Sequence, residues 1–182
     1  SANRIIDRHL DAENPRTASR PLPAGRLRLW EMTAMSSVSL AIFLFAAAML
    51  NTLTLVLAPV AVVVVVGYPY TKRFTWTANL MLGWALAIAP SAAWIGVTGS
   101  LTWEPVLLSA AVAFWAGSFD ILYHVQDHDF YEISGLHSVA RRFGVPTAFW
   151  IARGLDALAV MCLVGLGIWM DLAFPFFIGC AV

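Results

Sequence analysis

The sequence contains few charged residues. Only 12% of its 182 residues are Asp, Glu, Lys or Arg, whereas a typical soluble domain has about 25%. Hydrophobic residues make up 60% of the chain, and the mean hydropathy is +0.75. This balance excludes an ordinary water-soluble domain and indicates a protein whose solvent is largely lipid.

The sequence also lacks the motifs of several other protein classes. Its two cysteines, Cys162 and Cys180, lie in apolar segments without the spacing of a metal or disulfide site, so we interpret both as packing residues. There is no signal-peptide pattern at the start, no glycine-rich nucleotide loop and no Ser-His-Asp order typical of a catalytic triad. We therefore expect neither a zinc protein nor a nucleotide-binding fold, and no nucleic-acid partner.

Five long apolar segments are present instead. A helix needs about 20 mostly apolar residues to cross the hydrocarbon core of a bilayer. The predicted spans are Leu29 to Leu50, Leu53 to Tyr70, Thr77 to Val97, Pro105 to Gln126 and Thr147 to Met170. These segments predict an all-α fold, a polytopic transmembrane helical bundle that contacts the lipid bilayer.

The basic residues follow a one-sided pattern. If consecutive spans alternate in direction, the loops around Asn51, residues 98–103 and residues 170–171 share one face and contain no Lys or Arg. By the positive-inside rule, the opposite face is cytoplasmic, so we expect a multi-pass protein of the bacterial inner membrane. On or near that face lie all eleven basic residues: Arg4, Arg8, Arg16, Arg20, Arg26, Arg28, Lys72, Arg73, Arg141, Arg142 and Arg153.

Both terminal segments are shorter than a membrane span. The polar-tipped helix that carries Asn3 to Asp11 covers roughly 16 Å at a rise of 1.5 Å per residue. The apolar segment from Ala173 to Val182 is similarly short. We therefore expect residues 1–182 to form a single transmembrane domain that is truncated at both ends.

The first acidic segment has a helical spacing. Asn3, Asp7 and Asp11 are four residues apart, so on a helix they form one stripe. Carboxylate and amide oxygens suit Mg²⁺, which typically takes one or two carboxylates together with water and substrate phosphate. The alternative is a solvated helix end, where the aspartates pair with neighbouring Arg4, Arg8 and His9.

The second acidic segment closes the fourth long span. Asp120 and Asp127 are seven residues apart, which on a continuous helix places them two turns apart on one face. Ionisable residues at membrane depth are costly, so they are a functional hypothesis by default. The alternative is that Asp120 simply accepts a hydrogen bond from His124 one turn further on.

Basic and aromatic residues accompany the two acidic segments. A diphosphate site requires cations that grip phosphate oxygens, although each cation can equally be a positive-inside anchor. Tyr68, Tyr70 and Trp76 can form an aromatic wall beside Lys72, or belong to the aromatic belt of the membrane interface. The basic residues that reach the face of the aspartates are Arg16, Arg20, Lys72, Arg73, Arg141 and Arg142.

Taken in order, these motifs resemble the UbiA superfamily of intramembrane aromatic prenyltransferases, and within it most closely the 4-hydroxybenzoate polyprenyltransferases of quinone biosynthesis. The resemblance covers essentially the whole chain, and the combination is far more specific than any single motif. The motifs are Asn3-x-x-x-Asp7-x-x-x-Asp11, Asn14-Pro-Arg-Thr, Arg20-Pro-Leu-Pro-x-Gly25, Gly67-Tyr-Pro-Tyr-Thr-Lys-Arg73, Asp120-Ile-Leu-Tyr-x-x-Gln-Asp127 and Gly135-Leu-His-Ser138.

The resemblance implies a nine-helix fold in which two aspartate-rich motifs face each other at the cytoplasmic mouth of a cavity. It implies Mg²⁺-dependent transfer of a prenyl group from a prenyl diphosphate to an aromatic acceptor such as 4-hydroxybenzoate, in ubiquinone or menaquinone biosynthesis. The implied catalytic residues are Asp7, Asp11, Asp120 and Asp127, with Asn3, Asp7, Asp11 and Asp127 as metal ligands. The implied substrate-binding residues are Asn3, Arg16, Arg20, Tyr68, Tyr70, Lys72, Arg73, Tyr123, Gln126, His137 and Arg141.

The chain departs from the family pattern at one position. The second motif of the family usually reads Asp-x-x-x-Asp, but the residue four after Asp127 is Tyr131, whose phenol is a poor Mg²⁺ ligand. Either Asp129 or Glu132 replaces the missing ligand, or the second metal is bound less tightly. Two other functions remain open: a catalytically inactive homologue, and a transporter whose intramembrane acids line an ion path.

Overall fold

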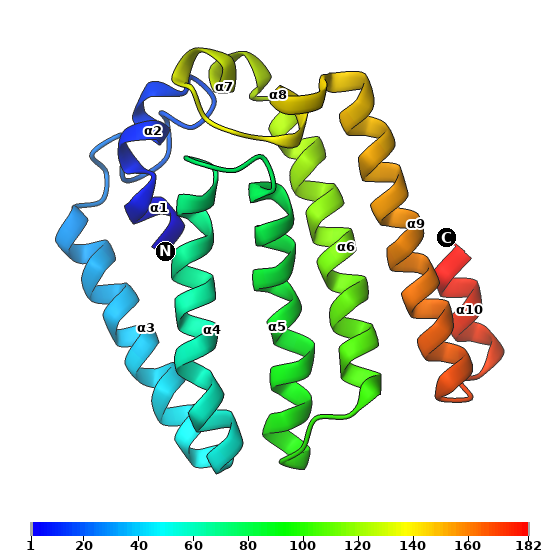
Figure 1. Cartoon of the computed structure of the whole chain (residues 1–182). Helices are drawn as coiled ribbons and strands as arrows, with labels where there is room; N and C mark the ends of the chain where they lie inside the picture. The colour runs from blue at the N-terminus through cyan, green and yellow to red at the C-terminus, as the bar shows by residue number, and fades with distance from the viewer. Residues whose placement is uncertain (1, 182) are drawn as a thin grey trace. The chain divides into compact units, whose positions relative to one another are not determined.

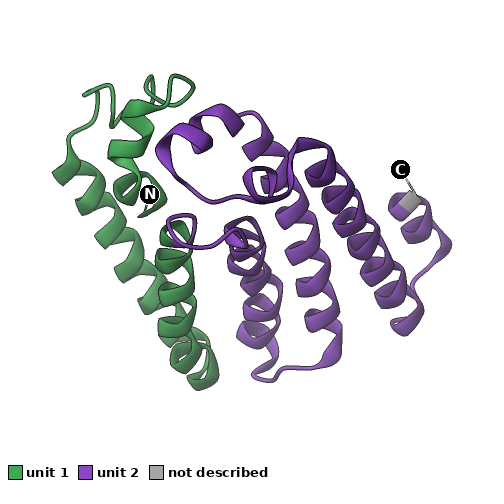
Figure 2. Cartoon of the chain, turned by 45° about the horizontal axis from the view of Figure 1, so that its top comes forward, with its two compact units in different colours: residues 1–70 green, residues 71–182 purple. Residues whose placement is uncertain are grey.

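The computed structural model describes residues 2–181, which are mostly helical and contain no strand. The chain divides into two compact units, Ser1–Tyr70 and Thr71–Val182, which Figure 2 shows in different colours. Each unit is described by itself.

The first unit contains two short helices followed by a hairpin of two long ones. Its helices are α1 (Ala2–Ile6), α2 (Arg8–Glu13), α3 (Leu29–Leu50) and α4 (Thr52–Thr71, whose last residue begins the second unit). Asn51 separates α3 from α4, and its side-chain Oδ1 accepts a hydrogen bond from the backbone N–H of Thr54 at 2.9 Å. This contact satisfies one of the donors left unpaired at the start of α4.

The second unit is built on three long helices that lie side by side, α5, α6 and α9 (Figure 1). Two short helices, α7 and α8, connect α6 to α9, and α10 folds back onto the end of α9. The bounds are α5 (Ala78–Thr98), α6 (Trp103–Val125), α7 (His128–Ser134), α8 (Val139–Phe143), α9 (Val145–Trp169) and α10 (Phe174–Ala181).

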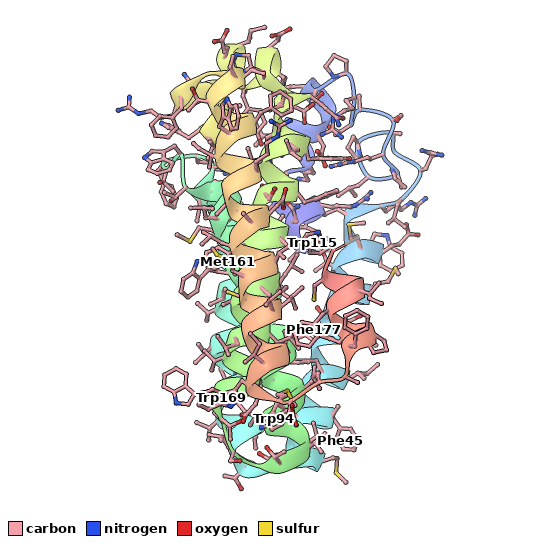
Figure 3. The ribbon with its side chains drawn as sticks, turned by 90° about the vertical axis from the view of Figure 1, so that its right-hand side faces the viewer. Phe45, Trp94, Trp115, Met161, Trp169 and Phe177 are labelled. Atoms are coloured by element: carbon pink, nitrogen blue, oxygen red, sulfur yellow. The ribbon has the colours of Figure 1, made fainter. Side chains whose placement is uncertain are left out.

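The five predicted spans are confirmed. Helices α3, α4, α5, α6 and α9 are long and apolar enough to cross a membrane, and each begins and ends within two residues of the predicted bounds. The all-α fold class is therefore correct. Large apolar side chains on these helices are exposed, and Figure 3 shows the indole of Trp169 projecting outward from the end of α9.

Close contact between α5 and α6 depends on small residues. A Cβ atom added to Gly83 would lie 2.2 Å from the backbone oxygen of Ala113 and 3.0 Å from the backbone nitrogen of Gly117. Further along the same helices, the hydroxyls of Ser91 and Ser109 lie 2.7 Å apart and share a hydrogen bond. Such close approach and interhelical hydrogen bonding replace the hydrophobic effect, which is absent between helices in lipid.

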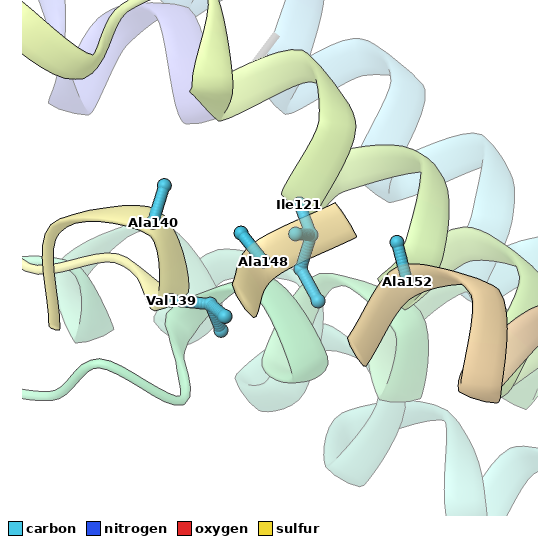
Figure 4. Close-up of a cluster of buried hydrophobic side chains, with 5 residues drawn as sticks. All are labelled: Ile121, Val139, Ala140, Ala148 and Ala152. Atoms are coloured by element: carbon cyan, nitrogen blue, oxygen red, sulfur yellow. The ribbon is translucent and has the colours of Figure 1, made fainter. Parts of the chain in front are cut away.

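The apolar core of the second unit lies where α8 packs against α6 and α9. It contains Ile121, Val139, Ala140, Ala148 and Ala152, all at most 1% exposed (Figure 4). Lys72, Arg73, Arg141 and Arg142 belong to segments at this same end of the unit, where α5 and α9 begin and α6 ends.

Two local predictions require correction. The continuous helix expected over Asn3 to Asp11 is broken at Asp7, whose backbone angles are φ −94° and ψ 6°. Likewise, Asp120 and Asp127 do not share one helical face, because α6 ends at Val125. Beyond that point, the N–H groups of Gln126 and Asp127 bond three residues back, to Tyr123 and His124, which tightens the last turn and ends the helix.

Candidate functional site

The first acidic segment keeps its stripe despite the break at Asp7. The backbone N–H of Asp7 bonds to the carbonyl of Asn3 at 2.9 Å, and that of Asp11 bonds to the carbonyl of Asp7 at 2.8 Å. This i to i−4 pattern stacks the three side chains one turn apart, as predicted. Asp7 is 3% exposed and Asp11 is 8% exposed, whereas Asn3 is exposed.

Arg20 neutralises the charge of Asp11, the last residue of this stripe. Its Nη1 lies 2.8 Å from Oδ1 and 3.0 Å from Oδ2 of Asp11, so one nitrogen donates to both carboxylate oxygens. The Thr17 hydroxyl donates to the backbone carbonyl of Asp11 at 2.9 Å. The loop after α2 thus folds back onto Asp11, and a charge-assisted contact compensates for the burial of that carboxylate.

The second acidic segment is arranged differently. Asp127 is 7% exposed and lies at the corner between α6 and α7, where it is the residue before the first turn of α7. Asp120 lies within the last two turns of α6, and its carboxylate is engaged within the second unit. Its Oδ2 accepts a hydrogen bond from the side-chain Nδ2 of Asn79 at 2.8 Å and lies 3.2 Å from Nδ1 of His124.

The contact between Asp120 and His124 predicted as the structural alternative is therefore present. Nδ1 of His124 also lies 2.8 Å from the backbone carbonyl of Asp120, which only accepts, and 2.9 Å from Nδ2 of Asn79, which only donates, so the tautomer of the ring decides which of these contacts is a hydrogen bond. The imidazole ring packs edge to face on Tyr131, with 4.9 Å between the centroids. Tyr131 is 4% exposed and belongs to this packed cluster.

The acidic residues that follow Asp127 lie outside that cluster. Asp129 is exposed, and Oε1 of Glu132 lies 3.5 Å from Nε2 of His128 on the surface of α7. Neither carboxylate occupies the buried position of Tyr131. The departure of this segment from the family pattern therefore replaces a carboxylate with an aromatic ring that packs on His124.

The structure places the predicted basic ligands in different settings. The guanidinium of Arg141 donates to the backbone carbonyl of Leu136 at 2.6 Å, which ties together the turn before α8. Lys72 is half-buried, and its backbone carbonyl accepts a hydrogen bond from the N–H of His137 at 2.7 Å. Arg16 and Arg73 are exposed.

The predicted aromatic residues belong to both units. Tyr68 and Tyr70 lie in the last turns of α4 in the first unit. In the second unit, Trp76 packs edge to face on Phe143, with 5.1 Å between centroids. Tyr123 stacks on Phe119 at 5.8 Å, and the predicted Gln126 is exposed at the end of α6.

Sequence reasoning missed Asn79. This residue in the first turn of α5 is only 1% exposed, and its side chain bonds to residues on two other elements. A buried amide is satisfied by hydrogen bonds in nearly all proteins, so its partners must be found. The only sequence signal was a polar residue near the start of an apolar span, which is also common at helix ends.

The residues of the first acidic segment fit a hard divalent cation. Among the described residues, no three or more His, Cys, Asp or Glu side chains are grouped closely enough to share one ion. Asp7 and Asp11 nevertheless offer two buried carboxylates one turn apart. Two carboxylates without sulfur or imidazole suit Mg²⁺ completed by water and phosphate, and not a softer metal.

A chain of five apolar helices, with buried carboxylates on segments outside them, defines a multi-pass membrane protein with a polar site at the helix ends. The whole chain, residues 1–182, matches the UbiA prenyltransferase family. The chain therefore belongs to this family, which confirms the resemblance inferred from its motifs.

Relatives of this chain are named as prenyltransferases. The 4-hydroxybenzoate octaprenyltransferase of Marinobacter nauticus is 34% identical over 178 residues, which are 97% of this chain and 60% of that protein. The protein of the same name from Aliivibrio salmonicida is 32% identical, over 93% of this chain and 59% of its own length. The chain thus spans about 60% of these two curated relatives.

A solved structure has the same fold. The apo structure of a UbiA homolog from Aeropyrum pernix K1 matches 99% of this chain with a TM-score of 0.92 and 31% sequence identity. The match covers 68% of that chain.

Proposed function

We propose that this protein transfers a prenyl group from a prenyl diphosphate to an aromatic acceptor of the 4-hydroxybenzoate type. The observation that carries the proposal is the stripe of Asp7 and Asp11, two buried carboxylates one turn apart with Arg20 on the second. Membership of the UbiA family and the names of the two relatives support the choice of reaction and acceptor.

Asp7 and Asp11 of the first unit would hold Mg²⁺, and the motif of the second segment gives Asp127 the role of a metal ligand in its own unit. When bound, the metal supplies charge neutralisation to the diphosphate leaving group. Arg20 already donates to Asp11 and offers its remaining N–H groups to phosphate oxygens. Apolar helix faces would exclude water from the reacting allylic carbon, and aromatic rings would stabilise its developing positive charge.

The acids of both segments lie at helix ends, which favours this proposal over an ion-coupled transporter. Asp7 and Asp11 precede α3, Asp127 follows α6, and Asp120 lies in the last two turns of α6. Transporters typically place their ion sites near the middle of the bilayer, in broken helices. Asp156 belongs to neither segment and lies near the middle of α9.

Radiolabelled prenyl transfer to 4-hydroxybenzoate tests the proposal. Membranes containing the full-length protein should form prenylated product with Mg²⁺ and none when EDTA removes it. Membranes from cells without the protein are the control. Product formed equally in the control, or no product with Mg²⁺ over a range of prenyl lengths, would contradict the proposed function.

A further inference from the structure

The segment that returns from α7 to α9 is attached to α5 as well as to its neighbours in the chain. After α7, the chain turns at Gly135, with φ +72°, and passes through residues 136–138 into α8. The backbone N–H of His137 donates to the carbonyl of Lys72 at 2.7 Å, and that of Val139 donates to the side-chain Oδ1 of Asn79 at 3.1 Å. Both acceptors precede or begin α5.

The side chain of Asn79, on α5, contacts two other elements at once. Its Oδ1 accepts from Val139, at the start of α8, and its Nδ2 donates to the carboxylate of Asp120 on α6 at 2.8 Å. The orientation of the amide is fixed, because Val139 presents an N–H group and only the amide oxygen can accept it. The NH₂ group must then face Asp120, where a carboxylate oxygen accepts its hydrogen bond. Nδ1 of His124 lies 2.9 Å from the same NH₂ nitrogen and 3.2 Å from the same carboxylate oxygen.

These contacts attach the α7–α8 segment to α5 and the residues before it at His137 and Val139, which lie between Asp127 and Arg141 in the chain. The segment continues from α6 at its first end, and at its second end the side chain of Val139 is buried in the apolar core while its N–H bonds to Asn79 (Figure 4). The polar network of Asn79, Asp120 and His124 therefore connects the span α6 to the returning segment through α5.

We propose that Asn79 is a positioning residue, which acts through Asp120 and Val139 to hold the α7–α8 segment so that its Asp127 and Arg141 can bind the diphosphate. This assigns Asp120 as the acceptor that orients Asn79, and not as a metal ligand. The inference rests on the proposed function for its kinetic consequence, but the contact itself is independent of any activity.

An exchange of the two polar groups tests the contact. Asn79→Asp places two carboxylates at a distance of about 3 Å, where they repel unless one is protonated. Adding Asp120→Asn restores one amide and one carboxylate with the original net charge. Asp171→Asn is the matched control for Asp120→Asn, because it also changes an acid to an amide but at the opposite end of the unit. Asp171 has a φ of +51°, which Asn tolerates.

The first readout is hydrogen exchange of the peptide covering residues 135–143 in the full-length protein. Asn79→Asp should accelerate exchange there. Adding Asp120→Asn to Asn79→Asp should restore the slow rate, whereas adding Asp171→Asn to Asn79→Asp should leave the exchange fast. If Asn79→Asp does not fold, Asn79→Ser serves instead: it removes the same bonds without repulsion, so its fast exchange should not be restored by Asp120→Asn. Equal exchange in wild type and Asn79→Ser would overturn the proposed contact.

The second readout separates positioning from simple stability. The KM for prenyl diphosphate should rise about 10- to 100-fold in Asn79→Asp, the range typical of residues that orient a ligand. It should return to the wild-type value in the double variant Asn79→Asp with Asp120→Asn. The KM for the aromatic acceptor should change little in either variant. A loss of kcat alone, or an equal rise of both KM values, would overturn the positioning role. If the wild type transfers no prenyl group, the proposed function fails, whereas the exchange data still decide the contact.

Discussion

The two acidic segments differ in how their carboxylates are used. In the first unit, Asp7 and Asp11 remain stacked one turn apart, and the one cation that bonds to Asp11 within the described contacts is Arg20 from a following loop. In the second unit, Asp120 bonds to Asn79 and His124 and so fixes the arrangement of three helical elements. Both segments space their aspartates by whole helical turns in the sequence. The carboxylates of the first segment are candidate metal ligands, whereas Asp120 of the second segment holds helices together.

Tyr131 explains part of this difference. It occupies the position where the family pattern has a second carboxylate, and it is buried against His124 with 4.9 Å between ring centroids. A phenol remains neutral near pH 7 and is a weaker ligand than a carboxylate. The second segment therefore offers Asp127 to a metal but no buried carboxylate one turn later.

The largest expected effect is all or none and concerns the membrane topology of the chain. In a background with Cys162→Ala and Cys180→Ala, Ser19→Cys and Ser100→Cys should be labelled from opposite sides by a membrane-impermeant maleimide. The reason is that, if consecutive spans alternate in direction, all Lys and Arg residues fall on or near one face, which includes Ser19 but not Ser100. Labelling of both cysteines from the same side would contradict the topology.

Next in size is the loss of the first acidic stripe. Asp7→Ala or Asp11→Ala in the full-length protein should lower prenyl transfer by at least about 100-fold, because charge stabilisation of the leaving group is lost. Glu13→Ala, an exposed acid on the same helix as Asp11, is the control and should retain activity. Near-normal turnover in both aspartate variants would show that this stripe does not serve the reaction.

A smaller effect is expected from the helix packing that supports the second segment. Gly83→Ala adds a Cβ atom 2.2 Å from the backbone oxygen of Ala113, so it should destabilise the protein by about 1–3 kcal/mol. Thermal unfolding in detergent measures this change. In the control Gly154→Ala, the new Cβ meets nothing within 4 Å, so its midpoint should not fall. Equal midpoints for the two variants would contradict the close packing of α5 on α6.

The smallest effect is expected at Tyr131. Tyr131→Asp adds the missing hard ligand, so it should lower the Mg²⁺ concentration for half-maximal transfer without changing the affinity for the aromatic acceptor. Tyr131→Phe, which keeps the ring on His124, controls for packing. If Asp129 or Glu132 already supplies the ligand, Tyr131→Asp should do little and removing that neighbour should raise the Mg²⁺ requirement. If the Mg²⁺ titration is unchanged in Tyr131→Asp, Asp129→Ala and Glu132→Ala alike, this half of the motif does not bind metal.

The sequence was sufficient for the membrane spans and for the first acidic segment. Long apolar runs are set by bilayer thickness, so their ends follow from composition alone, and the spacing of Asp7 and Asp11 depends only on local helical geometry. The corner after Val125 was not predictable, because it depends on the bonds of Gln126 and Asp127 to residues three positions back. An apolar span gives no signal for that change of bonding.

The role of Asn79 was beyond sequence reasoning for another reason. Its partners Asp120 and Val139 lie 41 and 60 residues further along the chain. No local pattern encodes contacts at that separation, since they arise only when α5, α6 and α8 have packed. A single sequence therefore reveals the candidate ligands more readily than the residues that hold them in place.

Metal binding by the full-length protein tests the difference between the two segments most directly. Mn²⁺ can replace Mg²⁺ and be titrated by electron paramagnetic resonance in the presence of a non-reactive diphosphate analogue. Asp11→Ala should abolish the tightest Mn²⁺ binding, whereas Asp120→Asn, which keeps an acceptor for Asn79, should retain it. Tight binding that survives Asp11→Ala and disappears in Asp120→Asn would contradict the assignment of the first segment as the metal site and of Asp120 as a structural acceptor.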